Sequence, residues 1–194
     1  LLPVEEQQLG AEPPDPRVIL EQELNSYHST HHSLERLYKE ISGNEILWRS
    51  TPTIAPVEDP SVSSHYGKRR DPFTNLPAFH SGIDFSGPAG TPIYAPADGI
   101  VRKAGPSAGY GLLVELDHGS GISIKNFKPT DYMTRYGHLS RLAVQANQFI
   151  QRGELLGYTG NTGRSTGSHL HYEIHTNKRP TNPWRNLSHF SISR

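Results

Sequence analysis

Hydrophobic and polar positions follow two different periods along the chain. Between residues 15 and 42, apolar, aromatic and histidine side chains recur at intervals of four and three, at Leu20, Leu24, Tyr27, His31, Leu34, Tyr38 and Ile41. This spacing is typical of one face of an amphipathic helix. Asp15 can cap the start of such a helix and Gly43 can end it. We predict an N-terminal amphipathic helix that packs against the rest of the chain or a partner helix, with an autonomous coiled-coil dimer as the alternative.

From residue 64 onward, the pattern changes to short apolar runs that are separated by glycine and proline. The runs that predict strands are 93–95, 99–104, 112–116, 122–127, 133–139, 154–159 and 169–175. Several short strands with turn residues between them, and no second helical period, favour an antiparallel arrangement. We therefore predict a mainly β fold, an antiparallel sheet or sandwich, with its functional site in a groove across the sheet or on its loops.

A proline-rich connector separates these two parts. Pro52, Pro56 and Pro60 are too close together for a regular element to persist between them, so we predict an extended tether. The predicted organisation is a helical arm with its connector over 1–56, a β domain over 57–187 and a tail over 188–194. Three roles are open for the arm: tethering, docking a protein partner, or lying over the groove as an inhibitory segment. The polar connector favours tethering or docking.

Composition excludes several classes of function. The 194-residue chain has no cysteine and a formal net charge of +0. Without thiolates, a metal site has to use histidine and carboxylate side chains. The balanced charge provides no broad basic surface, so no nucleic-acid partner is expected. No apolar run approaches the roughly 20 residues that span a bilayer. Because the chain does not begin with Met, we expect any export signal or membrane anchor to lie upstream in a longer precursor.

Five scattered residues have the chemistry of a hydrolytic zinc site: His80, Asp84, His138, His169 and His171. Such a site needs three nitrogen or oxygen ligands, an open position for water, and acid or base groups nearby. In a fully extended segment, His80 and Asp84 would be roughly 13 Å apart, which is too far to share one ion. The chain must therefore bend between them, and a glycine in that segment permits this.

His169 and His171 need no bend, because alternate residues of a strand face the same way. One of them can bind the metal while the other leans over the open position, and spacing does not decide which. Each element of the pattern also has a plainer explanation when taken singly. The His-Leu-His pair fits a polar outer face, and His138 fits a hydrogen-bonded core histidine.

The longer sequence segments around these residues resemble the lysostaphin-type, or LytM, family of zinc endopeptidases, which act on bacterial cell-wall peptidoglycan. The matching segments follow the family's order and are 64–74, 80–85, 90–101, 136–140 and 160–173. The resemblance implies that His80, Asp84 and His171 hold one Zn²⁺ per chain. It also implies that His138 and His169 are the catalytic histidines beside the open position.

All five residues are present, whereas the family includes degenerate members that act only as activators of cell-wall amidases. We therefore predict a zinc-dependent peptidoglycan endopeptidase. The alternatives are a non-catalytic regulator that activates an amidase and a peptidoglycan-binding scaffold.

The connector phrase over 47–57 and the segment 62–67 resemble the exported members of Gram-negative bacteria, which mostly cleave the D-Ala to meso-diaminopimelate cross-link. This resemblance implies peptidoglycan stem peptides as substrate and the periplasm or cell envelope as location. One departure is a longer stretch, 122–135, where the family has a short hairpin. We expect it to form one wall of the groove, with its aromatics Phe127 and Tyr132 packing against the core edge or contacting substrate.

Overall fold

The computed structural model describes residues 17, 20–21, 24–25 and 45–187. The predicted helix over 15–42 and the predicted tail over 188–194 therefore lie almost wholly outside the described residues. The few positions described within the arm, Leu20 and Leu24 among them, have helical backbone. The described residues from Glu45 onward belong to one compact unit, the β-rich body. No helix in the described part of the chain is long and apolar enough to cross a membrane.

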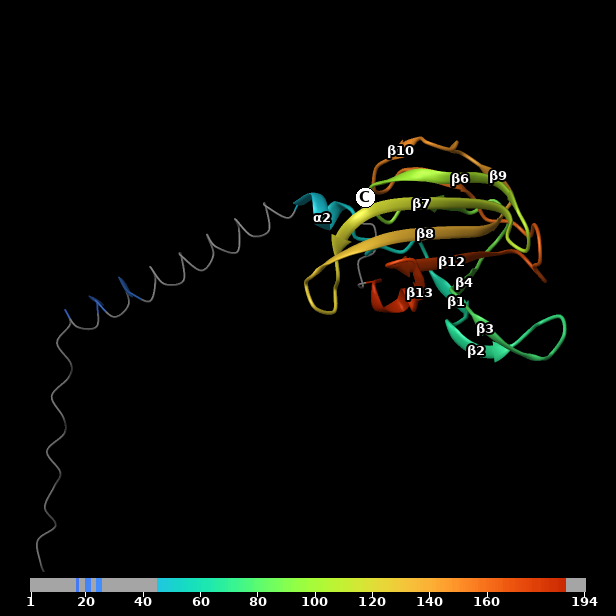
Figure 1. The fold of residues 1–194 in the computed structure, drawn as a ribbon, viewed down its shortest axis with the longest axis horizontal. Coiled ribbons are helices and arrows are strands. Elements are labelled where there is room, and N and C mark those ends of the chain that lie inside the picture. The colour runs from blue at the N-terminus through green and yellow to red at the C-terminus, as the bar shows by residue number, and fades with distance from the viewer. Residues whose placement is uncertain (1–16, 18–19, 22–23, 26–44, 188–194) are drawn as a thin grey trace, which may run out of the picture. The chain divides into compact units, whose positions relative to one another are not determined.

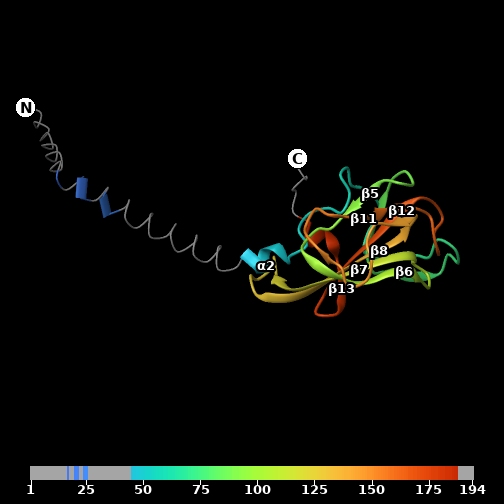
Figure 2. The same ribbon diagram turned by 90° about the horizontal axis from the view of Figure 1, so that it is seen from above.

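Antiparallel strands make up most of the body (Figures 1 and 2). The elements in chain order are α2 (Glu45–Arg49), β1 (Ser61–Ser64), β2 (Gly67–Arg70), β3 (Pro77–His80), β4 (Ile83–Ser86), β5 (Pro92–Tyr94), β6 (Gly99–Ser107), β7 (Gly111–Ile122), β8 (Pro129–Leu139), β9 (Arg141–Leu142), β10 (Phe149–Ile150), β11 (Leu155–Tyr158), β12 (His169–Thr176), β13 (Arg179–Thr181) and the 3₁₀ turn η1 (Pro183–Arg185).

An eight-stranded sheet has the order β1-β4-β12-β8-β7-β6-β10, with β13 paired to β12. A three-stranded sheet, β5-β11-β9, and the separate β2-β3 hairpin complete the body. In Figure 1, the long strands β6, β7, β8 and β12 run side by side and the β2-β3 hairpin projects from one end. The prediction of a mainly β, antiparallel fold is confirmed.

Strand β12 shows how the sequence alternation separates the core from the functional face. Its residues Leu170, Tyr172 and Ile174 are fully buried in the hydrophobic core, together with residues of both larger sheets such as Ile93 and Leu116. Because successive side chains of a strand point to opposite faces, the intervening residues of β12 face away from this core. These are the polar residues from His169 to His175. Burial of the apolar side chains of β12 therefore holds the strand in place, and the polar side chains on its opposite face are positioned with it.

The structure corrects the prediction of a strand over 122–127. Strand β7 ends at Ile122, and a tight turn follows in which Phe127 N–H donates to Ser123 O at 2.8 Å. Phe127 has φ 54 and is 71% exposed at the tip of the β7-β8 hairpin. Tyr132 is buried, and its hydroxyl donates to Ile122 O. Hydrophobic runs at hairpin tips resemble strands, because periodicity alone does not show where the chain reverses.

The connector does not form the extended tether that its prolines predict. Thr51 is fully buried, and its hydroxyl oxygen accepts from Ile122 N–H at 2.8 Å. Arg152 Nη2 donates to the carbonyl oxygens of Trp48 and Thr51, each at 2.8 Å. These hydrogen bonds join the segment around α2 to the β body.

Candidate metal centre

Two adjacent strands and a sharp bend bring three of the five candidate residues together. In the register of β4 and β12, Asp84 lies directly opposite His171. His80 ends β3, and the chain bends at Ser81 and Gly82 before β4 begins. A Cβ on Gly82 would lie 2.3 Å from Tyr172 O, so only glycine allows this bend to pack against the backbone of β12. The predicted bend is confirmed.

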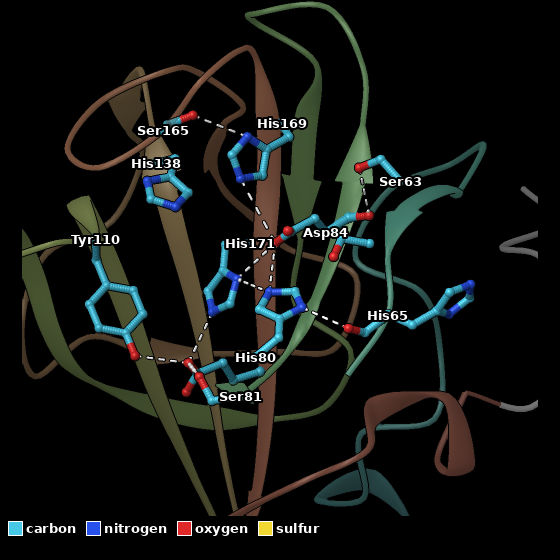
Figure 3. Close-up of polar contacts among 12 residues, drawn as sticks. Ser63, His65, His80, Ser81, Asp84, Tyr110, His138, Ser165, His169 and His171 are labelled. Carbon is cyan, nitrogen blue, oxygen red and sulfur yellow. Dashed lines mark hydrogen bonds and ion pairs between the residues drawn. The ribbon is translucent and has the colours of Figure 1, made fainter. Parts of the chain in front are cut away.

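The three side chains form a tight triangle, shown in Figure 3. His80 Nε2 lies 3.1 Å from Asp84 Oδ1 and 3.0 Å from His171 Nδ1. His171 Nδ1 is 2.8 Å from Asp84 Oδ1. The structure therefore groups His80, Asp84 and His171 as a possible metal site, and all three residues are buried.

The outer nitrogens of the two imidazoles show which atoms face the centre of the triangle. His80 Nδ1 lies 2.9 Å from His65 O, and a carbonyl oxygen can only accept, so this nitrogen carries the proton. His171 Nε2 lies 2.9 Å from Glu173 Oε1 and donates to that carboxylate. With neutral rings, the lone pairs of His80 Nε2 and His171 Nδ1 would meet Asp84 Oδ1 with no donor among them. Either a proton or a metal ion at this point would relieve the repulsion between these lone pairs.

The electrostatics agree with a site that attracts positive charge. Burial alone would lower the pKa of His171, but hydrogen bonds to Asp84 and Glu173 outweigh it and raise that pKa to about 9. Burial would raise the pKa of the Asp84 carboxyl, but hydrogen bonds with His171 and His80 hold it well below its usual range. A proton on His171 balances the carboxylates when no metal is bound, and a divalent metal can take its place.

Neighbouring side chains hold the triangle from outside. Arg69 Nη1 donates to Asp84 Oδ2 at 3.0 Å, which leaves Oδ1 directed at the two histidines. Glu173 is fully buried, and its Oε1 accepts from His171, from Ser81 Oγ and from Tyr110 OH at 2.8 Å. Burial opposes ionisation of Glu173, but hydrogen bonds from His171, His175 and Ser81 outweigh it and hold its pKa well below the usual range.

Sequence reasoning expected a hydrogen-bond partner for the ligand histidines but named none. Glu173 follows His171 by two residues on the same strand, so the strand period places both on one face, and this signal could have identified it. Tyr110 carried no local signal. It reaches Glu173 through the tertiary fold, and its carbonyl oxygen also accepts from His138 N–H at 2.7 Å.

His138 and His169 lie beside the triangle, with ring centroids 4.7 Å apart (Figure 3). His138 Nδ1 donates to Thr162 O at 2.8 Å, and His169 Nδ1 donates to Gly167 O at 2.8 Å. Both rings therefore have an unprotonated Nε2 when neutral. Burial is the main cause that lowers the pKa of His138, which keeps it neutral at neutral pH. The structure thus brings all five candidate residues together.

His138 also has an unusual backbone conformation, with φ 65. Non-glycine residues seldom adopt positive φ, and such strain is concentrated at functional sites. The hydrogen bonds of its backbone N–H to Tyr110 O and of its ring to Thr162 O hold this conformation. Strand β8 therefore presents His138 to the groove at the point where its regular geometry ends.

A groove of about 360 Å³ opens over the triangle and contains Asp84, His138, His169 and His171. We call it the metal-site groove. Its remaining walls are Ser63, Ser64, Arg69, Pro72, Phe73, Ser86 and the loop residues 164–168. The stretch 122–135 does not line it, so the expectation that this stretch forms a groove wall is wrong. The long β7-β8 hairpin extends toward α2 at the other end of the sheet (Figure 1).

Sequence comparison identifies the family. Residues 78–183, more than half of the chain, match the sequence model of the family described as Peptidase family M23. The chain belongs to peptidase family M23. The matched region contains all five candidate residues, and the resemblance to the lysostaphin-type family is confirmed.

The M23 domain is similar to longer peptidoglycan enzymes. It is 40% identical over 130 residues to the DD-carboxypeptidase/endopeptidase Mpg of Neisseria meningitidis, covering 67% of this chain and 28% of that protein. It is 42% identical over 122 residues to the peptidoglycan DD-endopeptidase ShyA of Vibrio cholerae, covering 62% of this chain and 26% of that protein. The chain therefore spans less than a third of the length of these relatives.

Solved structures show the same M23 fold. A zinc-containing peptidase from Vibrio cholerae superimposes with a TM-score of 0.58 at 31% identity, covering 68% of this chain and 39% of that one. The catalytic domain of lysostaphin from Staphylococcus simulans superimposes with a TM-score of 0.53 at 27% identity, covering 64% of this chain and 90% of that one. The antiparallel fold described above is the fold of M23 metallopeptidases.

Proposed function

We propose that this chain is a zinc-dependent endopeptidase that hydrolyses the D-Ala to meso-diaminopimelate cross-links of peptidoglycan. The observation that carries the proposal is the convergence of His80 Nε2, Asp84 Oδ1 and His171 Nδ1 beside two further histidines in one open groove. Named relatives of the M23 domain supply the substrate class.

Zinc fits this donor set. Two imidazoles and one carboxylate are common zinc ligands in hydrolases, and bonds of about 2.0–2.2 Å place ligand atoms roughly 3.4 Å apart. The triangle, with sides of 2.8–3.1 Å, would need to widen by about half an ångström to accept the ion. When bound, zinc supplies a Lewis acid that polarises the scissile carbonyl and lowers the pKa of water.

The other two histidines perform the proton transfers in this proposal. His138 and His169 each present an unprotonated Nε2, because backbone carbonyls hold the proton on Nδ1. One accepts a proton from the attacking water and returns it to the leaving amine, while the unprotonated Nε2 of the other accepts a hydrogen bond from that water and orients it.

Location and partners follow from the substrate. Peptidoglycan lies in the cell envelope, so we propose an exported protein that acts in the periplasm or envelope. The proposed partner surface is the arm over 15–42, where aromatic and histidine residues recur at helical spacing. The proposed organisation remains an arm with its connector over 1–56, a peptidase domain over 57–187 and a tail over 188–194.

Incubation of purified sacculi with the protein tests the proposal. We expect cross-linked muropeptide dimers to be converted to monomers, because the cut restores a free diaminopimelate amine on one stem and a D-Ala carboxylate on the other. A chelator should abolish the conversion and added zinc should restore it. Mass analysis of the released muropeptides is the measurement.

The same experiment separates the alternatives. An amidase regulator would release no muropeptide from sacculi alone but would accelerate an added amidase. A peptidoglycan-binding scaffold would sediment with sacculi and leave the dimers intact. A zinc-loaded protein that leaves the dimers intact would contradict the proposed function.

Glu173→Gln is expected to raise the dissociation constant for zinc by about 10- to 100-fold, which is typical when the hydrogen-bond partner of a ligand histidine is lost. The carboxylate fixes the proton of His171 on Nε2 and makes Nδ1 a stronger donor to the metal. Competition with a chromophoric chelator measures the affinity.

A matched control is Glu154→Gln, since Glu154 is exposed, accepts from the N–H of Gln151 at 3.0 Å and contacts no candidate ligand. Its zinc affinity should equal that of the wild type. Equal affinity of Glu173→Gln and the wild type would refute the role of Glu173.

A further inference from the structure

One arginine in the metal-site groove is held by two contacts that use only part of its hydrogen-bonding capacity. Arg164 lines the same groove as His138 and His169, and its side chain is 50% exposed. Its Nη2 donates to Asp71 Oδ1 at 2.7 Å, and its guanidinium carbon lies 4.5 Å from the centroid of the Phe73 ring. A guanidinium has five N–H donors, so most of them remain available to a ligand.

The loop that carries Arg164 packs closely against β7 and also supports the histidines. Gly163 has φ 71, and a Cβ there would lie 2.2 Å from Gly111 N, so the loop packs directly against the start of β7. The N–H of Arg164 donates to Gly109 O at 2.8 Å. Two residues earlier, Thr162 O accepts from the ring of His138. The position of Arg164 relative to His138 is therefore set by a few short contacts.

The other charged side chains at this end of the groove, Arg69 and Asp71, already form hydrogen bonds and ion pairs within the protein. Arg69 donates through Nη1 to both Asp84 and Ser64, so its charge supports the metal centre. Asp71 Oδ1 accepts from the N–H groups of Phe73 and Thr74 as well as from Arg164, which shares its negative charge among three donors. Arg164 is thus the groove arginine that makes no ion pair with a candidate metal ligand, and its hydrogen-bond donors other than the Nη2–H to Asp71 face the groove's ligand space.

The chemistry of the cross-link supplies a matching anion, and this step rests on the proposed function. The nitrogen of the scissile amide is attached to the diaminopimelate carbon that also carries a free carboxylate. The substrate therefore has a negative charge immediately beside the bond that is cut.

We propose that Arg164 binds this carboxylate, so that the enzyme favours cross-links whose diaminopimelate carboxylate is free over those in which it is amidated. A planar guanidinium can bind a carboxylate through two parallel hydrogen bonds, and a fixed guanidinium loses little entropy on doing so. The groove volume of about 360 Å³ lies at the lower end of small-ligand sites, so the arginine and the metal centre share one small chamber.

The test compares two muropeptide dimers that differ only at that carboxylate, one free and one amidated. Arg164→Gln should raise KM for the free-acid dimer by about 10- to 100-fold, the loss expected for a charged hydrogen bond. For the amidated dimer, KM should change less than threefold, and zinc content should be unchanged. Arg164→Lys should recover part of the lost affinity, since it restores the charge without the planar pair of donors.

Arg141→Gln is the matched control. The Arg141 guanidinium lies 4.2 Å from the centroid of the Tyr158 ring, a similar cation–π contact, but it does not line the groove. Its KM for both dimers should equal that of the wild type.

Unchanged KM in Arg164→Gln, or an equal rise in KM for both dimers, would overturn the inference. If the wild type cuts neither dimer, the proposed function is wrong. Calorimetric affinities of both dimers for the wild type and Arg164→Gln then still decide whether Arg164 recognises the carboxylate.

Discussion

His171→Ala is expected to abolish zinc binding at the metal centre and to reduce cross-link cleavage by at least about 10³-fold, because the site loses both the polarising ion and one of its three ligands. His171 donates Nδ1 to the centre of the triangle and is itself fixed by Glu173. Two remaining ligands, His80 and Asp84, make too few bonds to retain the ion. Zinc content by atomic emission and turnover of a muropeptide dimer are the two measurements.

Two further variants show that the effect comes from the ligand. Asp84→Asn keeps the size of the side chain and removes its charge, so it should also lose zinc. His65→Ala should keep both zinc and activity, because only its backbone carbonyl contacts His80 and its exposed side chain points away from the triangle (Figure 3). Full zinc content in His171→Ala would refute the proposed ligand set.

His138→Ala is expected to retain zinc and to reduce turnover by about 10²- to 10⁴-fold, the usual contribution of a general acid or base. His138 makes no hydrogen bond to the three candidate ligands, and its ring is held by Thr162 O at 2.8 Å. Removal of the ring therefore eliminates a proton acceptor and leaves the triangle intact. Turnover should fall mainly through kcat.

Backbone strain at His138 requires a second variant. At φ 65, alanine is less tolerant of the conformation than asparagine, which adopts positive φ more readily. His138→Asn should therefore retain the loop geometry and still lose turnover. If His138→Asn lost zinc, or if it retained full activity, the catalytic role proposed for His138 would be wrong.

The local pattern of the sequence predicted two geometric features of the candidate site correctly. Alternation along 169–175 placed His169 and His171 on one face, and the short distance between His80 and Asp84 required the bend that occurs at Gly82. These inferences needed only bond lengths and strand geometry, which do not depend on the rest of the chain. The same local signals gave a false strand over 122–127, where the chain reverses at a hairpin tip.

The sequence by itself determined the donor types, the absence of thiolate ligands, the β class of the fold and which residues share a strand face. Only the tertiary structure decided which atoms meet. The register of β4 against β12 sets Asp84 opposite His171, and packing of the loop around Thr162 and Gly163 turns His138 and Arg164 toward the same groove. Register and loop packing are set by burial of the core face. Residues distant in sequence therefore meet through long-range contacts, which the local spacing of hydrophobic and polar residues does not predict.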